Sequence, residues 1–179
     1  MKNKYVLTGG PGSGKSSIIL SLEALGCYVV REAAEDVIRL RQAHGIAEPW
    51  KEIDFQDKIL ALQLRREKEA EKIGKPITFL DRGTLDGLAY YQIQGREPSR
   101  AMKDERHRLY RERGYNKVFL IENLGSCATN KVRREDLDQA LELERLQEEN
   151  YREAGYDVIR IAPSNVWKRT EEIFLHTMR

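Results

Sequence analysis

A glycine-rich loop near the N-terminus carries the first residues with recognisable chemistry. Residues 9–16 read Gly-Gly-Pro-Gly-Ser-Gly-Lys-Ser and fit the pattern G-x-x-x-x-G-K-[ST], and Ser17 follows directly. Glycines allow consecutive backbone N–H groups to face one polyphosphate, and a helix that begins at the loop directs its positive dipole end at the same anion. The motif predicts that a nucleoside triphosphate binds here, on Gly9, Gly10, Pro11, Gly12, Ser13, Gly14, Lys15, Ser16 and Ser17.

Two residues of this loop have individual roles in the prediction. Lys15 is expected on the β- and γ-phosphates, and Ser16 is expected to give its hydroxyl to Mg²⁺. We also expect Lys15 to face solvent in the nucleotide-free loop, so that Lys15→Ala abolishes triphosphate binding without unfolding the chain. The alternative is a plain glycine-rich turn with an exposed lysine. The apolar run at residues 4–8 and the helix-spaced apolar residues after the loop favour the phosphate-binding interpretation.

Three charged residues stand at the ends of apolar runs that are typical of strands. Asp81 and Arg82 follow Ile-Thr-Phe-Leu, and Glu32 lies just beyond the run at residues 27–30. Ligands bind at the carboxyl ends of parallel strands, so Asp81 is a candidate for holding Mg²⁺ through water or for accepting a proton from an acceptor hydroxyl. Glu32 is a second candidate for that proton, and Arg82 for clamping an anionic substrate or the transferring phosphoryl group. The residues alone leave open which carboxylate takes the proton, and whether Asp81 only caps a turn or Glu32 only opens a helix.

A polar stretch at residues 122–136 is predicted to form a flexible flap that carries cations. Arg133 and Arg134 stand near its end, before a long helix, where they can deliver positive charge to the γ-phosphate as the flap closes and excludes water. The alternative is a solvated helix start whose arginines pair with the acidic residues that follow.

Two further segments have less specific chemistry. Tyr90, Tyr91 and Gln92 could stack on or hydrogen-bond an acceptor that carries a ring, or could instead be half-buried packing residues. Residues 100–113 are rich in Lys and Arg, but a charge run of this kind is typical of a solvated helix face, so we expect no nucleic-acid partner.

The elements that position these residues follow from an alternation of apolar runs and helical patterns. Runs without polar alternation, separated by helices, indicate a parallel sheet covered on both faces and therefore a three-layer α/β fold. The expected strands are residues 4–8, 27–30, 76–80, 117–121 and 157–162. The expected helices follow the glycine loop and occupy residues 33–44, 55–74, 85–94, 99–113, 135–154 and 166 onward.

The composition fits one domain over residues 1–179. Lys and Arg total 31 against 29 Asp and Glu. The net charge of +2 is too small to indicate electrostatic attraction of the whole chain to nucleic acid or to a membrane surface. No stretch approaches the roughly 20 apolar residues of a membrane span, and the run before the glycines is too short and polar for a signal-peptide core, which favours a cytoplasmic setting. Cys27 and Cys127 have neither the spacing nor the histidine partners of a disulfide framework or a zinc site.

Four sequence segments in this order resemble a known family. They are the loop TGGPGSGKSS, the strand end REAAE, LDRG followed by LDGLAYYQ, and RREDLDQALELERLQEENYREAGYDVIRI. Together they are similar to the small AAA-type P-loop ATPases related to the ribosylnicotinamide kinase domain of NadR, and more distantly to thymidylate kinases. The resemblance implies a P-loop NTPase fold with a sheet of order 2-3-1-4-5, ATP as the nucleotide, and a nucleobase near residues 162–165. It also implies that Asp81 and Arg82 are the acidic–arginine pair of these kinases and that Arg133 and Arg134 are flap arginines.

Two departures narrow the expected function. Gly83 stands where a thymidylate kinase has an aromatic residue or histidine, which disfavours thymidylate, and the guanine-recognition motif NKxD is absent. We therefore expect a Mg²⁺-dependent phosphotransferase that passes the γ-phosphoryl group of ATP to a small nucleoside- or nucleotide-like acceptor. The alternative is a nucleotide-dependent ATPase or GTPase switch, or a regulatory binding module, that uses the same loop. Acceptor-dependent release of ADP distinguishes the two.

Overall fold

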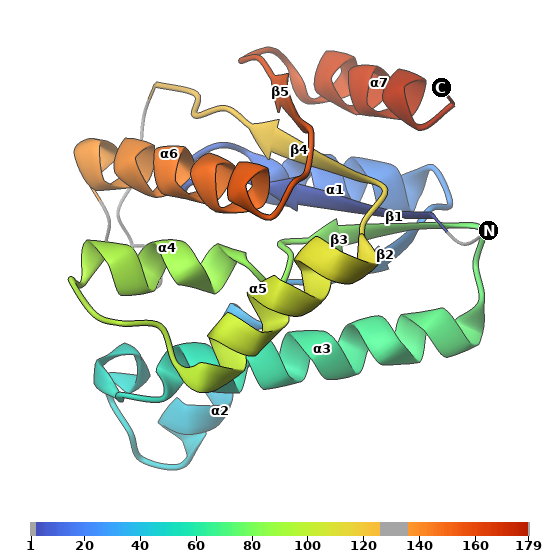
Figure 1. Ribbon diagram of the computed structural model, residues 1–179. Helices are drawn as coiled ribbons and strands as arrows, with labels where there is room; N and C mark the ends of the chain where they lie inside the picture. Colours follow the sequence, from blue (N-terminus) through green and yellow to red (C-terminus); the bar gives the residue numbers. More distant parts are fainter. Residues whose placement is uncertain (1–2, 126–135, 179) are drawn as a thin grey trace.

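A five-stranded parallel sheet forms the centre of the computed structural model, which describes residues 3–125 and 136–178 (Figure 1). The strands are β1 (Asn3–Thr8), β2 (Tyr28–Val30), β3 (Ile77–Asp81), β4 (Lys117–Ile121) and β5 (Val158–Ile161). They lie in the order β2-β3-β1-β4-β5, and every neighbouring pair is parallel. This order and the α/β class confirm the expected fold. Because parallel strands share one carboxyl edge, the residues that follow β1, β2 and β3 meet at that edge.

Helices cover both faces of the sheet. They are α1 (Lys15–Ala24), α2 (Ala34–Ala43), α3 (Phe55–Ile73), α4 (Asp86–Ile93), α5 (Arg100–Glu112), α6 (Leu137–Glu153) and α7 (Val166–Thr177), with a short 3₁₀ helix η1 (Pro49–Lys51) before α3. The α1 and α7 helices pack together on one face, whereas α3, α4, α5 and α6 lie on the other (Figure 1). The expected helices are therefore present, and η1 is an addition that the sequence pattern did not predict.

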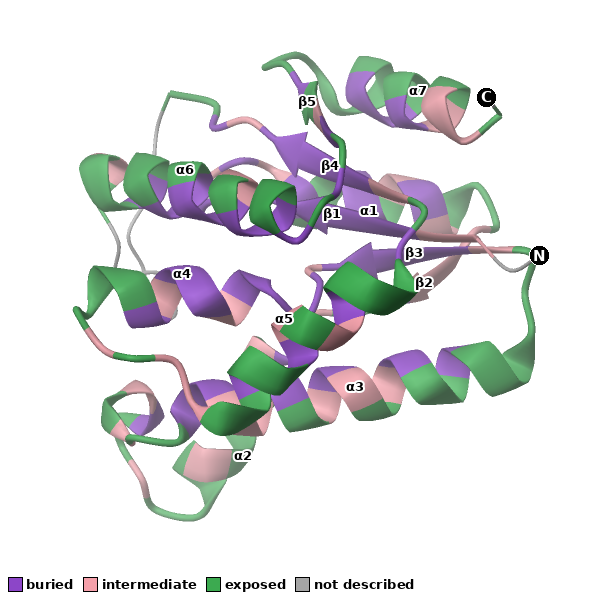
Figure 2. Cartoon of the chain, viewed as in Figure 1, coloured by how far each residue is buried: buried purple, intermediate pink, exposed green. Residues whose placement is uncertain are grey.

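Alternate residues of the strands fill two cores, one on each face of the sheet. Figure 2 shows the central strands as buried. Leu7, Phe79 and Phe119 pack against Ile18 of α1 and Ile173 of α7. The neighbouring strand residues Val6, Leu80 and Leu120 pack on the opposite side, with side chains of α3, α4 and α6. Both faces of the sheet are buried, which explains why the strands are continuous apolar runs rather than alternating ones.

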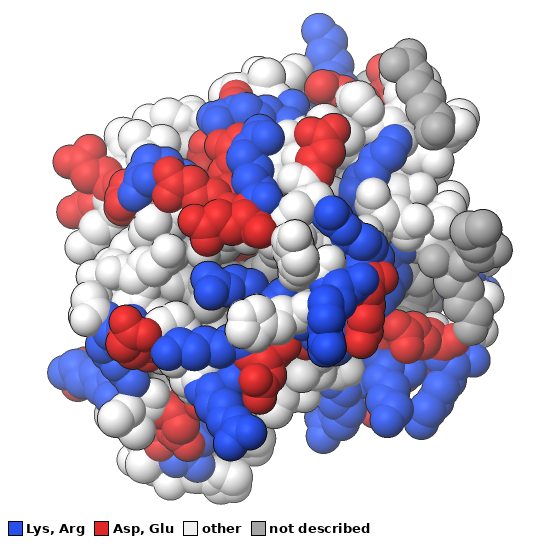
Figure 3. Space-filling model, in the orientation of Figure 1, with Lys and Arg blue, Asp and Glu red and all other residues white. Residues whose placement is uncertain are grey.

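Surface charge in the described part of the chain is mixed in sign. On the face viewed in Figure 3, Lys and Arg alternate with Asp and Glu. The basic helix α5 follows this pattern, because Arg108 pairs with Glu105 and Glu112, and Lys103 pairs with Glu97. This pairing fits a solvated helix face better than a binding strip for nucleic acid. None of the helices within residues 3–125 and 136–178 has the length and apolar character needed to cross a bilayer.

Candidate active site

The glycine-rich loop joins β1 to α1 at the carboxyl edge of the sheet, as the motif predicted. Gly9 has φ +136°, a conformation that residues with side chains rarely adopt. A Cβ on Gly9 would overlap the backbone oxygen of Ile121 in β4, and a Cβ on Gly10 would overlap that of Ala140 in α6. The loop therefore needs glycine at both positions because two neighbouring elements approach its backbone closely.

Lys15 is buried, with 6% of its surface exposed, so the expectation that it faces solvent is wrong. Its ammonium group folds back on the loop and donates to Gly9 O at 2.5 Å, Gly10 O at 3.0 Å and Ser13 Oγ at 3.1 Å. Burial, together with the positive charge of Arg82, lowers the pKa of Lys15 to about 7. The loop thus holds a desolvated cation in the position where phosphate charge would stabilise it.

Arg82 and Glu32, which the sequence placed at two separate strand ends, meet in an ion-paired cluster. Arg82 donates from Nε to Glu32 Oε1 at 2.7 Å and from Nη1 to Asp86 Oδ2 at 3.1 Å. Nη1 also reaches Gly9 O, at 3.5 Å. Burial opposes the charge of the guanidinium, but Glu32, Tyr90 and the acidic neighbours together raise the pKa of Arg82. The arginine is a fixed positive charge beside the loop.

Asp86, the first residue of α4, is a member of this cluster that the sequence analysis missed. Its carboxylate also accepts hydrogen bonds from Thr8 Oγ1 at 3.0 Å and from Tyr151 Oη at 2.8 Å. These partners come from β1 and α6, so no local sequence signal reports them. A carboxylate in the first turn of a helix is common in itself, because it interacts favourably with the helix dipole.

Asp81 ends β3 and is buried, and its carboxylate atom Oδ1 has no hydrogen-bond partner in the described part of the chain. Burial and the nearby charge of Glu32 raise the pKa of Asp81 to about 6, against the opposing effect of Lys15 and Arg82. Ser16 is exposed and lines the cavity described below. An unsatisfied carboxylate and a free hydroxyl are hard oxygen donors, and they fit Mg²⁺. The described residues contain no group of three His, Cys, Asp or Glu that could hold a metal, so phosphate oxygens and water would complete the coordination.

A cavity of about 570 Å³ extends from the loop to an apolar compartment. Ile38, Trp50, Phe55, Ile59 and Tyr90 contribute the apolar and aromatic surface of this compartment. The polar and small lining residues are Pro11, Gly12, Ser13, Gly14, Lys15, Ser16, Glu32, Ala34, Glu35, Gln56, Arg82, Asp86, Gly87 and Gln94. The cavity is large enough for a small molecule beside a phosphate group.

Tyr90, Tyr91 and Gln92 were the three candidates for contact with the ring of an acceptor. Of these three, only Tyr90 lines the cavity. Tyr91 is buried in the core and donates to Asp57 Oδ1 at 3.2 Å, and Gln92 accepts from Asn150 Nδ2 at 2.8 Å. These two are packing residues. Trp50 of η1 and Phe55, the first residue of α3, contribute the other aromatic surface of the cavity. The sequence pattern placed Phe55 in a helical apolar stripe but did not indicate that either residue lines a cavity.

Two side chains from other parts of the chain donate hydrogen bonds to backbone carbonyls of the glycine-rich loop. Asn123, which follows β4, donates to Pro11 O at 2.8 Å, and Arg169 of α7 donates to Ser13 O at 2.7 Å. Arg169 also donates to Glu122 O at 2.8 Å and is almost completely buried. Ser17 lies in the first turn of α1 and is exposed, but it does not line the cavity. Arg133 and Arg134 lie outside the described residues, as does most of the expected flap.

Comparisons with known proteins identify the family and the fold. The family model described as an AAA domain matches residues 4–169. No curated protein matches the sequence. The chain is similar in structure to deoxyadenosine kinase from M. mycoides with the products dCMP and dCDP bound, at 17% identity and a TM-score of 0.62 over 98% of both chains. A second structure of that enzyme, with dATP, gives 13% identity and a TM-score of 0.59 over 98% of this chain and 100% of the other.

The third similar structure is NadR in complex with NAD and AMP-PNP, at 12% identity and a TM-score of 0.68. The comparison covers 99% of this chain and 50% of NadR, so the chain spans about half the length of that protein. At these identities the likeness establishes the fold, which is that of small P-loop kinases. With the family model covering residues 4–169 and the phosphate-binding loop in its expected place, the chain belongs to the AAA domain family.

Proposed function

We propose that the protein is a Mg²⁺-dependent kinase that transfers the γ-phosphoryl group of ATP to a hydroxyl of a small, uncharged, nucleoside-like acceptor. The observation that carries the proposal is the cavity of about 570 Å³, which the phosphate-binding loop shares with an aromatic compartment. Arg82 connects the two parts, since its guanidinium reaches both Gly9 O of the loop and Glu32. The adenine nucleotides bound to the similar structures support ATP as the donor.

Glu32 is the proposed proton acceptor. Its side chain lines the cavity and is 31% exposed, whereas Asp81 is buried and does not line it. The acceptor oxygen forms a bond to the γ-phosphorus while the bond from that phosphorus to the bridging oxygen of ADP breaks. The hydroxyl proton passes to the Glu32 carboxylate, and Lys15 and Arg82 stabilise the charge on the phosphoryl oxygens. Mg²⁺ bound by Ser16 and, through water, by Asp81 would neutralise phosphate charge further.

The charges around the cavity favour an uncharged acceptor. Among the described lining residues the cations are Lys15, which belongs to the phosphate-binding loop, and Arg82, which is assigned above to the transferred phosphoryl group. Glu32 and Glu35 add negative charge beside the aromatic compartment. A nucleoside monophosphate would bring a further dianion to this region without a described cation to receive it, which is unfavourable in a partly dehydrated site.

The side chains of the compartment favour a flat ring with polar edges. Trp50, Phe55 and Tyr90 provide aromatic surface, on which a planar heterocycle can stack. Gln56 is 8% exposed, lines the cavity and makes no hydrogen bond to another described residue. Its carboxamide can pair with a ligand that offers both a donor and an acceptor, as a nucleobase does.

Release of ADP from ATP, with and without a panel of nucleosides, nucleoside monophosphates and ribosylnicotinamide, tests the proposal. Stimulation by a nucleoside supports it, whereas stimulation by monophosphates alone would contradict the charge argument. Slow release across the panel with ATP still bound would favour the switch instead. Glu32→Gln should lower kcat by about 100-fold or more if the residue is the base. Glu35→Gln is the matched control, because Glu35 lines the same cavity but pairs with Arg39 of its own helix.

A further inference from the structure

The backbone of Arg82 has an unusual conformation. Its φ of +70° lies in the left-handed region, which residues with side chains rarely adopt. The residue stands between the buried end of β3 and Gly83, and its side chain enters the cluster with Glu32 and Asp86. The surrounding structure must hold this conformation, because an unsupported arginine would relax to a negative φ and turn its guanidinium away.

The backbone of each residue from 82 to 84 makes hydrogen bonds or close polar contacts with other parts of the chain. Arg82 donates its N–H to Leu7 O of β1 at 3.0 Å, and its carbonyl accepts from Gln63 Nε2 of α3 at 3.1 Å. Gly83 N–H approaches Asp86 Oδ1 at 3.4 Å. Thr84 N–H donates to the Tyr115 hydroxyl at 3.1 Å. The bonds from Gln63 and Tyr115 come from side chains that do not line the large cavity.

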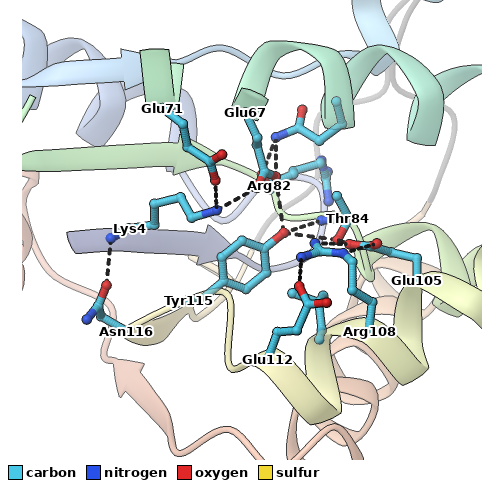
Figure 4. A network of polar contacts seen from close by, with 12 residues as sticks. Lys4, Glu67, Glu71, Arg82, Thr84, Glu105, Arg108, Glu112, Tyr115 and Asn116 are labelled. Atoms are coloured by element: carbon cyan, nitrogen blue, oxygen red, sulfur yellow. Dashed lines mark hydrogen bonds and ion pairs between the residues drawn. The ribbon is translucent and has the colours of Figure 1, made fainter. Parts of the chain in front are cut away.

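Tyr115 is the centre of a buried polar network, shown in Figure 4. Its hydroxyl lies 2.9 Å from Thr84 Oγ1 and donates to Glu67 Oε1 at 3.1 Å. Thr84 Oγ1 in turn donates to Glu105 Oε1 at 2.6 Å, and Gln63 Nε2 donates to Glu67 Oε1 at 3.3 Å. We call these five residues, Gln63, Glu67, Thr84, Glu105 and Tyr115, the support network.

Burying the polar side chains of the support network in the core costs free energy, because they lose their contacts with water. All five residues are at most 5% exposed, and two of them are acids. Burial raises the pKa of Glu67 to about 6, even though Lys4, Tyr115 and Gln63 favour its charged form. Apolar side chains of similar volume would often stabilise such a position equally well or better. A specific function would explain why polar residues occupy these buried positions. Two bonds of the network, from Gln63 and Tyr115, reach the backbone of residues 82–84.

We propose that Gln63, Thr84 and Tyr115 are positioning residues, which hold the left-handed backbone of Arg82 and so direct its guanidinium at Glu32 and Asp86 in the active site. This inference rests on the proposed kinase function. None of the three residues lines the large cavity. Gln63 and Thr84 line a small adjoining cavity of about 30 Å³ beside Arg82. We therefore expect their effect to be on transfer rather than on binding of ATP.

Tyr115→Phe is the first test, since it removes only the hydroxyl. We expect kcat for acceptor-dependent transfer to fall by about 10- to 100-fold, because small displacements of a reacting group cost this much, with little change in KM for ATP. Tyr5→Phe is the matched control. Tyr5 is also a buried tyrosine, but it packs in the core on the other face of the sheet, and its hydroxyl donates to Thr177 O at 3.3 Å. Equal loss of kcat in both variants, or an unchanged kcat in Tyr115→Phe, would overturn the proposal.

A second pair of variants distinguishes loss of the Thr84 hydroxyl from a general loss of packing. Thr84→Val removes the hydroxyl at nearly constant volume, and Thr84→Ser keeps it. Thr84→Val should lower kcat, and Thr84→Ser should retain most of it. A role in apolar packing alone predicts the opposite order, because serine loses a buried methyl group and valine does not. That order would contradict the positioning role.

A measurement without catalysis separates this inference from the proposed function. The Nε–H resonance of Arg82 reports its bond to Glu32 in the nucleotide-free protein, and Arg82→Lys assigns the signal by removing it. We expect Tyr115→Phe to shift or broaden this resonance and Tyr5→Phe to leave it in place. If the wild-type protein phosphorylates no acceptor, the kinase proposal fails while this result still decides the positioning role. An unchanged resonance in Tyr115→Phe would refute it.

Discussion

The buried ammonium group of Lys15 should give the nucleotide-free protein an unusual dependence of stability on pH. Burial and Arg82 lower the pKa of this lysine to about 7, compared with 10.5 for an unperturbed lysine. Between these two values the unfolded chain binds a proton at Lys15 that the folded chain has lost. The free energy of unfolding therefore rises with pH across this range, by about 1.4 kcal/mol per pH unit where the folded lysine is neutral.

The size of the effect follows from the same values. At pH 7 the folded lysine is about half protonated, and at pH 9 it is almost fully neutral, while the unfolded lysine stays charged. Integration over this interval gives a gain in stability on the order of 2 kcal/mol that belongs to Lys15. Lys15→Met removes the titrating group but keeps a long unbranched side chain. The variant should therefore lack this gain.

Urea unfolding at pH 7, 8 and 9, with both proteins free of nucleotide, measures the effect. The difference in unfolding free energy between wild type and Lys15→Met should grow by about 2 kcal/mol in favour of the wild type from pH 7 to pH 9. Saturating ATP should abolish the difference in slope, because phosphate charge keeps the bound lysine protonated, and Lys15→Met should gain little stability from ATP. Parallel pH profiles of the two nucleotide-free proteins would refute the argument that the lysine is desolvated.

Three further substitutions test other parts of the site. Gly83→Ala should destabilise the fold by about 1–3 kcal/mol in urea unfolding, because the new Cβ meets the Tyr151 hydroxyl, and adding Tyr151→Phe should restore part of the loss. Asp81→Asn should weaken binding of ATP by calorimetry when Mg²⁺ is present and much less when it is absent. The raised pKa of Asp81 also means that the folded wild type binds the extra proton between about pH 4 and 6, so its stability relative to Asp81→Asn should fall as pH rises through that range. Arg169→Met removes the donor to Ser13 O and should lower ATP affinity by roughly 10-fold, and an unchanged affinity would show that the loop holds its shape without it.

The sequence predicted the sheet and the loop well because both depend on local patterns. Continuous apolar runs identify buried parallel strands, and the glycine motif specifies a backbone shape. The strand-end positions of Glu32 and Arg82 were enough to bring them to one edge, although their ion pair required the structure.

The missed features depend on contacts between distant segments. The burial of Lys15 depends on how the loop folds back on itself, and the role of Asp86 depends on partners in β1 and α6. Tyr90 and Tyr91 are neighbours on one helix, yet one lines the cavity and the other packs in the core. Adjacent helical residues point about 100° apart, and only the packing of the helix decides which direction faces the ligand.

The space beside Gly83 has a consequence for how this family can diverge. The Tyr151 hydroxyl, fixed by its bond to Asp86, occupies the volume that a side chain at position 83 would need. A side chain at position 83 would clash with this hydroxyl, so position 83 can enlarge only if Tyr151 is lost, whereas Tyr151 can become smaller on its own. Among related sequences we expect covariation, in which a residue larger than glycine at position 83 is accompanied by the loss of tyrosine at position 151. Homologues that keep both residues should share the same arrangement of Asp86, and those that have exchanged both should hold their arginine by other means.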